Sequence, residues 1–170
     1  YILIDAIIYP EIQQLLNTYN NIHYYNELLG QTEEEVIWYQ KKNSGDSIFK
    51  ERTNIYSECL QITRTTKLLD NIIPENIYDL IKLDVQGSEI PILKGATKTI
   101  QHTSFIILEM PFMGKYNNSV PTFLEHIHYM NTINYVVYDI VEIHKINNII
   151  IQVDIIFIHK NKINGLKINT

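Results

Sequence analysis

The sequence predicts an α/β fold with a mostly parallel sheet and an antiparallel strand at its end. Apolar, strand-like runs alternate with helix-like segments through most of the 170 residues, which is the order that builds parallel sheets. Two strand-like runs then follow one another directly, and such neighbours pair antiparallel. The segment between Leu80 and Ala96 supports the same class, because an apolar strand ends at Asp84, Gly87 permits a sharp turn and a helix follows.

The first half of the chain contains four predicted strands, at Tyr1–Ala6, Ile22–Leu28, Glu35–Gln40 and Tyr56–Thr63. Pro10–Tyr19 is predicted to be a helix, because proline suits a first turn and apolar side chains then recur on one face. Lys41–Thr53 is polar and is predicted to be a loop, and Thr65–Ile72 is predicted to be a short helix.

The second half contains the strands Leu80–Leu83, Phe105–Glu109, Tyr135–Ile143 and Ile149–His159. Helices are predicted between Ser88 and Gly95, over Thr97–His102 and over Pro121–Ile133, the last with the apolar set Phe123, Leu124, Ile127 and Met130. The last two strands are joined by a turn at Asn147-Asn148. One domain is therefore expected over residues 1–160, followed by a polar tail at 161–170.

The composition of the chain limits the classes of function that the sequence favours. The formal net charge of −5, with Lys and Arg scattered along the chain, argues against nucleic acid as a partner. Cys59 is the only cysteine, so no internal disulfide forms and a reducing, cytoplasmic setting is expected. No apolar run approaches the roughly 18 residues of a membrane span. Because strand-like residues begin at Tyr1, without an initiator Met, we expect further residues upstream.

Acidic side chains end three predicted strands, at Asp5, Asp84 and Glu109. Ligands of open α/β sheets bind at the carboxyl edge of the strands, so these acids favour a site there. The alternative, that each acid caps the loop or helix that follows, remains open. Asp5 suits the hydroxyls of a ribose. Glu27, after the next strand, is expected near an adenine or the same ribose, or as a solvated turn residue.

The sequence lacks the residues that several other kinds of site require. None of the six glycines gives G-x-G spacing, and no phosphate loop is present. His126 and His128 lie two apart on a predicted helix and point away from each other, which excludes a zinc pair. A hard-metal site at Asp84 and Glu109 is less favoured, so the sequence predicts no metal.

The segment IKLDVQGSEIPILKGA resembles the signature of the FkbM-type S-adenosylmethionine-dependent methyltransferases. The residues that carry the resemblance are Lys82, Asp84, Gly87, Glu89, Leu93, Lys94, Gly95 and Ala96. Supporting agreement in order and spacing is found at Asn26–Gly30, Ser47, Phe105–Glu109 and Gln152–Phe157. The resemblance extends over nearly all of the chain.

The resemblance implies a Rossmann-like class I methyltransferase sheet of seven strands, the last of them antiparallel. The family's first strand and its Gly-rich loop do not appear, so the domain is expected to be truncated at its N-terminus. Asp5 then matches the acid that holds the cofactor ribose, and Glu27 lies on the adenine side. Asp84 lies at the junction of cofactor and acceptor and is the main catalytic candidate, with Glu89 and Glu109 as weaker ones.

Three functions follow. The leading one is methyl transfer from S-adenosylmethionine to a hydroxyl of a small molecule or glycan. Lys41–Thr53 and Phe112–Val120 would then shape the acceptor pocket. The second is a Rossmann-type oxidoreductase that uses a nicotinamide nucleotide, whose ribose Asp5 also suits. The third is a truncated module that binds a partner without catalysis. The oligomeric state has no signal in the sequence.

Overall fold

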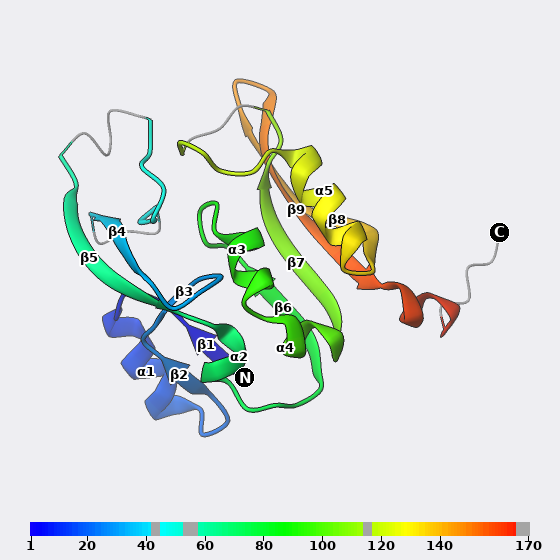
Figure 1. Ribbon diagram of the computed structural model, residues 1–170, viewed down its shortest axis with the longest axis horizontal. Helices are drawn as coiled ribbons and strands as arrows, with labels where there is room; N and C mark the ends of the chain where they lie inside the picture. The colour runs from blue at the N-terminus through cyan, green and yellow to red at the C-terminus, as the bar shows by residue number, and fades with distance from the viewer. Residues whose placement is uncertain (42–44, 53–57, 114–116, 166–170) are drawn as a thin grey trace.

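A computed structural model describes residues 1–41, 45–52, 58–113 and 117–165 (Figure 1). These residues form a mixed α/β structure, as predicted. Their strands are divided among three sheets, in the orders β1-β2, β3-β5-β4 and β6-β7-β9-β8. The single, mostly parallel sheet that the sequence predicts is therefore not found among the described residues, and parallel and antiparallel pairs occur together.

The first sheet is a parallel pair of short strands, β1 (Ile2–Ile4) and β2 (His23–Tyr25). Helix α1 (Pro10–Thr18) connects them, as a crossover between parallel strands requires. The helix begins at the predicted proline and ends one residue before the predicted boundary. Both strands are shorter than predicted, and the second predicted strand also includes the start of β3.

The second sheet contains β3 (Leu28–Leu29), β4 (Glu35–Gln40) and β5 (Leu60–Lys67), with β5 in the middle. The bounds of β4 are those predicted. The predicted helix over Thr65–Ile72 is wrong in its first half, because β5 continues to Lys67 and only α2 (Leu69–Ile72) is helical. Thr66 explains the difference: its side chain is buried and its hydroxyl donates to the Thr32 carbonyl at 2.6 Å.

The third sheet contains β6 (Tyr78–Leu83), β7 (Thr103–Pro111), β8 (Tyr135–Ile146) and β9 (Ile149–His159). Strands β6 and β7 are parallel, and β9 runs antiparallel to both β7 and β8. Asn147 and Asn148 form the predicted turn, with positive φ angles of 50° and 65° that suit a two-residue hairpin. Strand β8 carries three register irregularities against β9.

Three helices lie on one face of this third sheet: α3 (Glu89–Lys94), α4 (Thr97–Gln101) and α5 (Phe123–Thr132) (Figure 1). The main hydrophobic core lies between them and the sheet, where Leu93 and Met130 pack with Ile106, Leu108 and Phe157. Leu124, predicted to belong to the apolar face of α5, is 74% exposed, so that prediction is wrong. A 3₁₀ helix, η2 (Lys160–Gly165), follows β9. Among the described helices, none has the length and hydropathy needed to cross a membrane.

The start of α4 is capped by a residue from another helix. Its N-cap position is Ala96, which has no side-chain acceptor. Asp70 of α2 supplies one, because its carboxylate accepts from the backbone N–H groups of Lys98 and Thr99 at 2.8 and 2.9 Å. Burial by itself raises the pKa of Asp70, but these hydrogen bonds and those from Thr99 and Thr97 side chains bring the pKa below its usual value.

Asp70→Asn is expected to lower the free energy of unfolding at pH 7 by roughly 1 kcal/mol, the usual worth of an N-cap. Because the pKa of Asp70 is lowered in the folded state, its contribution is complete above the unfolded pKa and is lost as the pH falls through the folded pKa. Urea denaturation of both proteins should therefore show a difference at pH 7 that shrinks as the pH falls below the ordinary pKa of an aspartate. Asp79→Asn removes an exposed carboxylate on β6 and is the control. This variant should change neither the free energy of unfolding at pH 7 nor its dependence on pH.

Candidate active site

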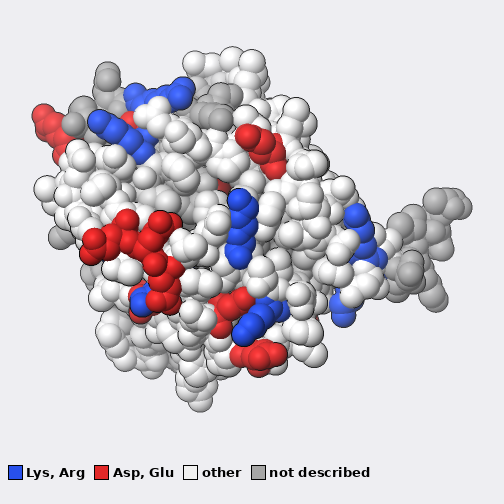
Figure 2. Space-filling view, in the orientation of Figure 1, with Lys and Arg blue, Asp and Glu red and all other residues white. Residues whose placement is uncertain are grey.

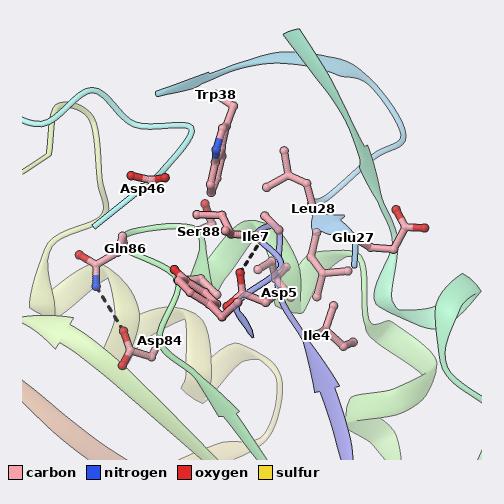
Figure 3. Close-up of a pocket in the computed structure, with 15 residues that line it drawn as sticks. Ile4, Asp5, Ile7, Glu27, Leu28, Trp38, Asp46, Asp84, Gln86 and Ser88 are labelled. Atoms are coloured by element: carbon pink, nitrogen blue, oxygen red, sulfur yellow. Dashed lines mark hydrogen bonds between the residues drawn. The ribbon is translucent and has the colours of Figure 1, made fainter. Parts of the chain in front are cut away.

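A cavity of about 320 Å³ lies where β1, β2 and β6 end (Figure 3). This volume falls in the range of roughly 300–1,000 Å³ that is typical of small-molecule sites. Residues from five parts of the chain line it: Ile4, Asp5, Ala6, Ile7, Tyr9, Glu27, Leu28, Leu29, Trp38, Asp46, Asp84, Val85, Gln86, Ser88 and Ile92. Asp5, Glu27 and Asp84 thus share one cavity, which is the placement that their positions after three strands predict.

Asp5 follows β1 and is half-buried at the wall of the cavity. Its Oδ1 accepts a hydrogen bond from the Ile7 backbone N–H at 2.7 Å. Burial raises the pKa of Asp5, the Ile7 hydrogen bond lowers it, and the nearby charges of Asp46 and Arg64 act in opposite directions, with a raised pKa as the result. Within the described residues Oδ2 has no hydrogen-bond donor, so this oxygen can accept from a ligand.

Trp38 closes one side of the cavity and was not predicted as a site residue (Figure 3). The residue is only 6% exposed. Its indole Nε1 is buried, and within the described residues it donates to no acceptor. A buried donor without an acceptor costs about 1–3 kcal/mol. The sequence signal was weak: Trp38 is the chain's single tryptophan and sits on an alternating strand.

The turn after β6 carries Asp84 into the cavity and is held in an unusual conformation. Gln86 and Gly87 have positive φ angles of 53° and 105°. The Gln86 carbonyl accepts from the Ser47 hydroxyl at 3.0 Å and from the Asn117 amide at 2.9 Å. These two donors belong to the segments predicted to shape an acceptor pocket, Lys41–Thr53 and Phe112–Val120, of which residues 42–44, 53 and 114–116 lie outside the described residues. Ser47 and Asn117 thus connect both segments to the turn.

Glu89, predicted as a catalytic candidate, holds this turn from inside. It is 1% exposed, and its Oε1 accepts from the backbone N–H groups of Val85 and Gly87, both at 3.2 Å. Its Oε2 lies 3.6 Å from Nε2 of His126, which is completely buried. Because Nδ1 of His126 lies 2.9 Å from the Thr122 carbonyl, Nδ1 is the donor there and Nε2 faces Glu89. This geometry supports a positioning role for Glu89, while its catalytic role stays a prediction.

Glu109, the third catalytic candidate, lies beside Asp84 rather than on the large cavity. It lines a second cavity of about 30 Å³. The Gln86 side chain joins the two carboxylates, because its amide donates to Asp84 Oδ1 at 3.2 Å and to Glu109 Oε2 at 3.1 Å. Burial, and next the charge and hydrogen bond of Asp84, raise the pKa of Glu109 to about 8. Gln86 had no signal in the sequence.

The sheet register extends this acidic group across three strands. Glu109 on β7 is directly opposite Asp154 on β9, and Asp154 is opposite Glu142 on β8. Directly opposite residues share a face of the sheet. Lys82, two residues before Asp84, therefore reaches the same face, and its Nζ lies 3.2 Å from Asp154 Oδ2. Asp154 was missed as a site residue, although an acid inside the apolar run of β9 was the available signal.

Figure 2 shows how the charged side chains of the described residues are distributed on one face of the molecule. Lys and Arg side chains occur at several places, including neighbouring groups at the upper left, and Asp and Glu side chains gather beside β3. The sequence places Glu33, Glu34 and Glu35 consecutively next to that strand, and all three are exposed. The Lys67 ammonium lies 3.5 Å from the Glu33 carboxylate.

Comparison with protein families gives one match. The model described as the methyltransferase FkbM domain matches residues 16–140, which is most of the chain. No curated protein and no solved structure matches the sequence significantly. The matched range includes Glu27, the Asp84 turn and Glu109, while Asp5 and Asp154 lie outside it.

Proposed function

The chain belongs to the FkbM methyltransferase family, and from this premise we propose that it transfers a methyl group from S-adenosylmethionine to a hydroxyl of a small molecule or glycan. The observation that carries the proposal is the cavity at the ends of β1, β2 and β6, which four acidic residues line, the predicted Asp5, Glu27 and Asp84 among them. A methyltransferase from this family needs a site for a nucleoside-like donor next to an acceptor site, and this cavity adjoins the Asp84 turn.

The residues of the cavity fit the donor. When bound, S-adenosylmethionine supplies a methyl group on a positively charged sulfur, which an acceptor oxygen displaces. Asp5 offers its Oδ2 to ribose hydroxyls, which are hydrogen-bond donors that carboxylates accept well. Glu27 lines the same wall one strand further along. Trp38, which is almost completely buried, forms another part of the wall.

Asp84 stands between this cavity and the loops of the acceptor side. We assign to it the positioning of the acceptor hydroxyl and the uptake of its proton. A methyl transfer mainly requires that donor and acceptor be aligned, which a turn fixed on both sides provides. The backbone next to Asp84 is held by three side chains. Glu89 accepts from the Gly87 N–H, and Ser47 and Asn117 donate to the Gln86 carbonyl. The three together would keep the carboxylate in one orientation.

We also propose that the first and the third sheet are parts of one class I methyltransferase-like sheet. Within the described residues β1 pairs only with β2, and β6 pairs in parallel only with β7. Side chains of β1 nevertheless pack against the core that β6 shares, through Ile2 and Ile4. A parallel strand between β1 and β6 would join the two into one sheet, with β9 as the antiparallel closing strand.

Binding of the donor tests the proposal directly. Titration calorimetry of the full-length protein with S-adenosylmethionine should show one saturable site. Asp5→Ala should weaken that binding by about 10- to 100-fold, because a charge-assisted hydrogen bond is lost. Asp139→Asn, an exposed carboxylate on β8, is the control and should bind as the wild type does. If the full-length protein binds a nicotinamide nucleotide and no S-adenosylmethionine, the proposal is wrong and the oxidoreductase alternative is right.

A further inference from the structure

We propose that Glu109, His144 and Asp154 bind a divalent transition-metal ion such as Mn²⁺. The site lies on the face of the third sheet next to the Asp84 turn. Three potential ligand atoms, one from each side chain, all lie within 4.8 Å of one another. Two carboxylates and an imidazole form a mixed oxygen and nitrogen set that Mn²⁺, Fe²⁺ and Zn²⁺ accept. This inference does not depend on the proposed methyl transfer.

The sheet register explains why the three residues meet. Glu109 and Asp154 are directly opposite each other on β7 and β9. Asp154 is opposite Glu142 on β8, and His144 is two residues further along that strand, on the same face. Since strand pairing fixes the backbone of all three residues, the side chains converge without support from a loop.

Asp154 is the residue that points most clearly to a ligand. Its side chain is only 5% exposed, and its Oδ1 is buried without a hydrogen-bond donor among the described residues. This oxygen lies 3.6 Å from Nε2 of His144, too far for a hydrogen bond but suitable for two ligands of one ion. Ligands about 2.1 Å from an ion lie at most about 4.2 Å apart, so small side-chain rotations complete the set.

The charge of the surroundings favours a cation as well. Glu109, Asp154 and Glu142 place three carboxylates in one row across the sheet, where like charges on opposite residues repel. The carboxylate of Asp84 lies next to this row, because the Gln86 amide joins it to Glu109. Lys82 supplies one positive charge, at 3.2 Å from Asp154 Oδ2 and 3.9 Å from Asp84 Oδ2. Lys82 thus approaches the other oxygen of Asp154, and Oδ1 is left for the ion.

The first test measures Mn²⁺ binding to the unaltered protein by the electron paramagnetic resonance signal of the free ion. One saturable site per chain is expected, and no saturable binding up to millimolar Mn²⁺ would overturn the proposal. His144→Ala and Asp154→Asn should each weaken the binding by at least about tenfold. The matched controls His128→Ala and Asp139→Asn, both exposed, should bind as the wild type does. Equal affinity in all four variants would also overturn it.

Two further measurements cover the case in which a variant does not fold. Paramagnetic Mn²⁺ added to the unaltered protein should broaden the amide resonances around Glu109, His144 and Asp154 and leave those of α1 sharp. The reverse pattern would contradict the site. Lys82→Met removes the ammonium that repels an entering ion and should tighten binding several-fold. Unchanged or weaker binding by this variant would show that the ion does not share Asp154 with Lys82.

Discussion

Replacement of Gly87 by alanine is expected to destabilise the protein by roughly 2–5 kcal/mol, the sum of backbone strain and overpacking. Gly87 has a φ angle of 105°, which side-chain-bearing residues rarely adopt. A Cβ atom there would lie 2.2 Å from Cγ1 of Val120, which is buried. Val120 must then move, and the turn that presents Asp84 moves with it. The change in the midpoint of urea denaturation measures the effect.

A second substitution separates the two causes. Asn134 follows α5 with a φ angle of 65°, and its side chain is exposed. Asn134→Ala therefore adds strain without a steric clash, and we expect it to cost about 1 kcal/mol. If Gly87→Ala is no more destabilising than Asn134→Ala, the close contact with Val120 is not what requires glycine at this position.

Asp84→Asn is expected to lower the rate of methyl transfer by about 10²–10⁴-fold, as the loss of a general base does. The substitution preserves the shape of the side chain, and the amide oxygen can still accept from Gln86. The uptake of a proton is lost, together with the negative charge that faces the Lys82 ammonium at 3.9 Å. The measurement is transfer of a labelled methyl group from S-adenosylmethionine to the best acceptor in a panel of monosaccharides and hydroxylated lactones.

The two kinetic parameters distinguish this role from a structural one. If Asp84 takes the proton, kcat falls while the affinity for S-adenosylmethionine, measured by calorimetry, changes little. If Asp84 only supports the turn, both fall together and the melting temperature falls with them. Asp79→Asn serves as the control, because its carboxylate lies on β6, the strand that leads to Asp84, and is exposed.

Local signals in the sequence predicted the elements whose determinants are local. The alternation in β4 gave its bounds, the proline gave the start of α1, and Asn147-Asn148 gave the hairpin. The strand at Thr65–Lys67 was missed because its partners are about 30 residues away in the sequence, at Thr32 and Glu34. Leu124 was misplaced because its apolar character does not say which side of α5 meets the core.

The candidate site divides in the same way. The placement of Asp5, Glu27 and Asp84 on one cavity was predictable, since the carboxyl ends of parallel strands meet at one edge. The group around Asp154 depends on which strands are neighbours and on their register, which the sequence does not contain. His144 illustrates this, because only the pairing of β8 with β9 brings it to Asp154.

The irregular pairing of β8 has a consequence for how this domain can change in evolution. β9 lies between β7 and β8 and is paired on both sides. An insertion or deletion of one residue in β9 would therefore turn the side chains that follow it to the opposite face of the sheet. A change before Phe157 would turn its side chain away from the core. A change before Asp154 would turn that carboxylate toward the face that the helices cover. β8 lies at the edge and already absorbs three shifts of register. Length variation among relatives should therefore be found in β8 and be absent from β9.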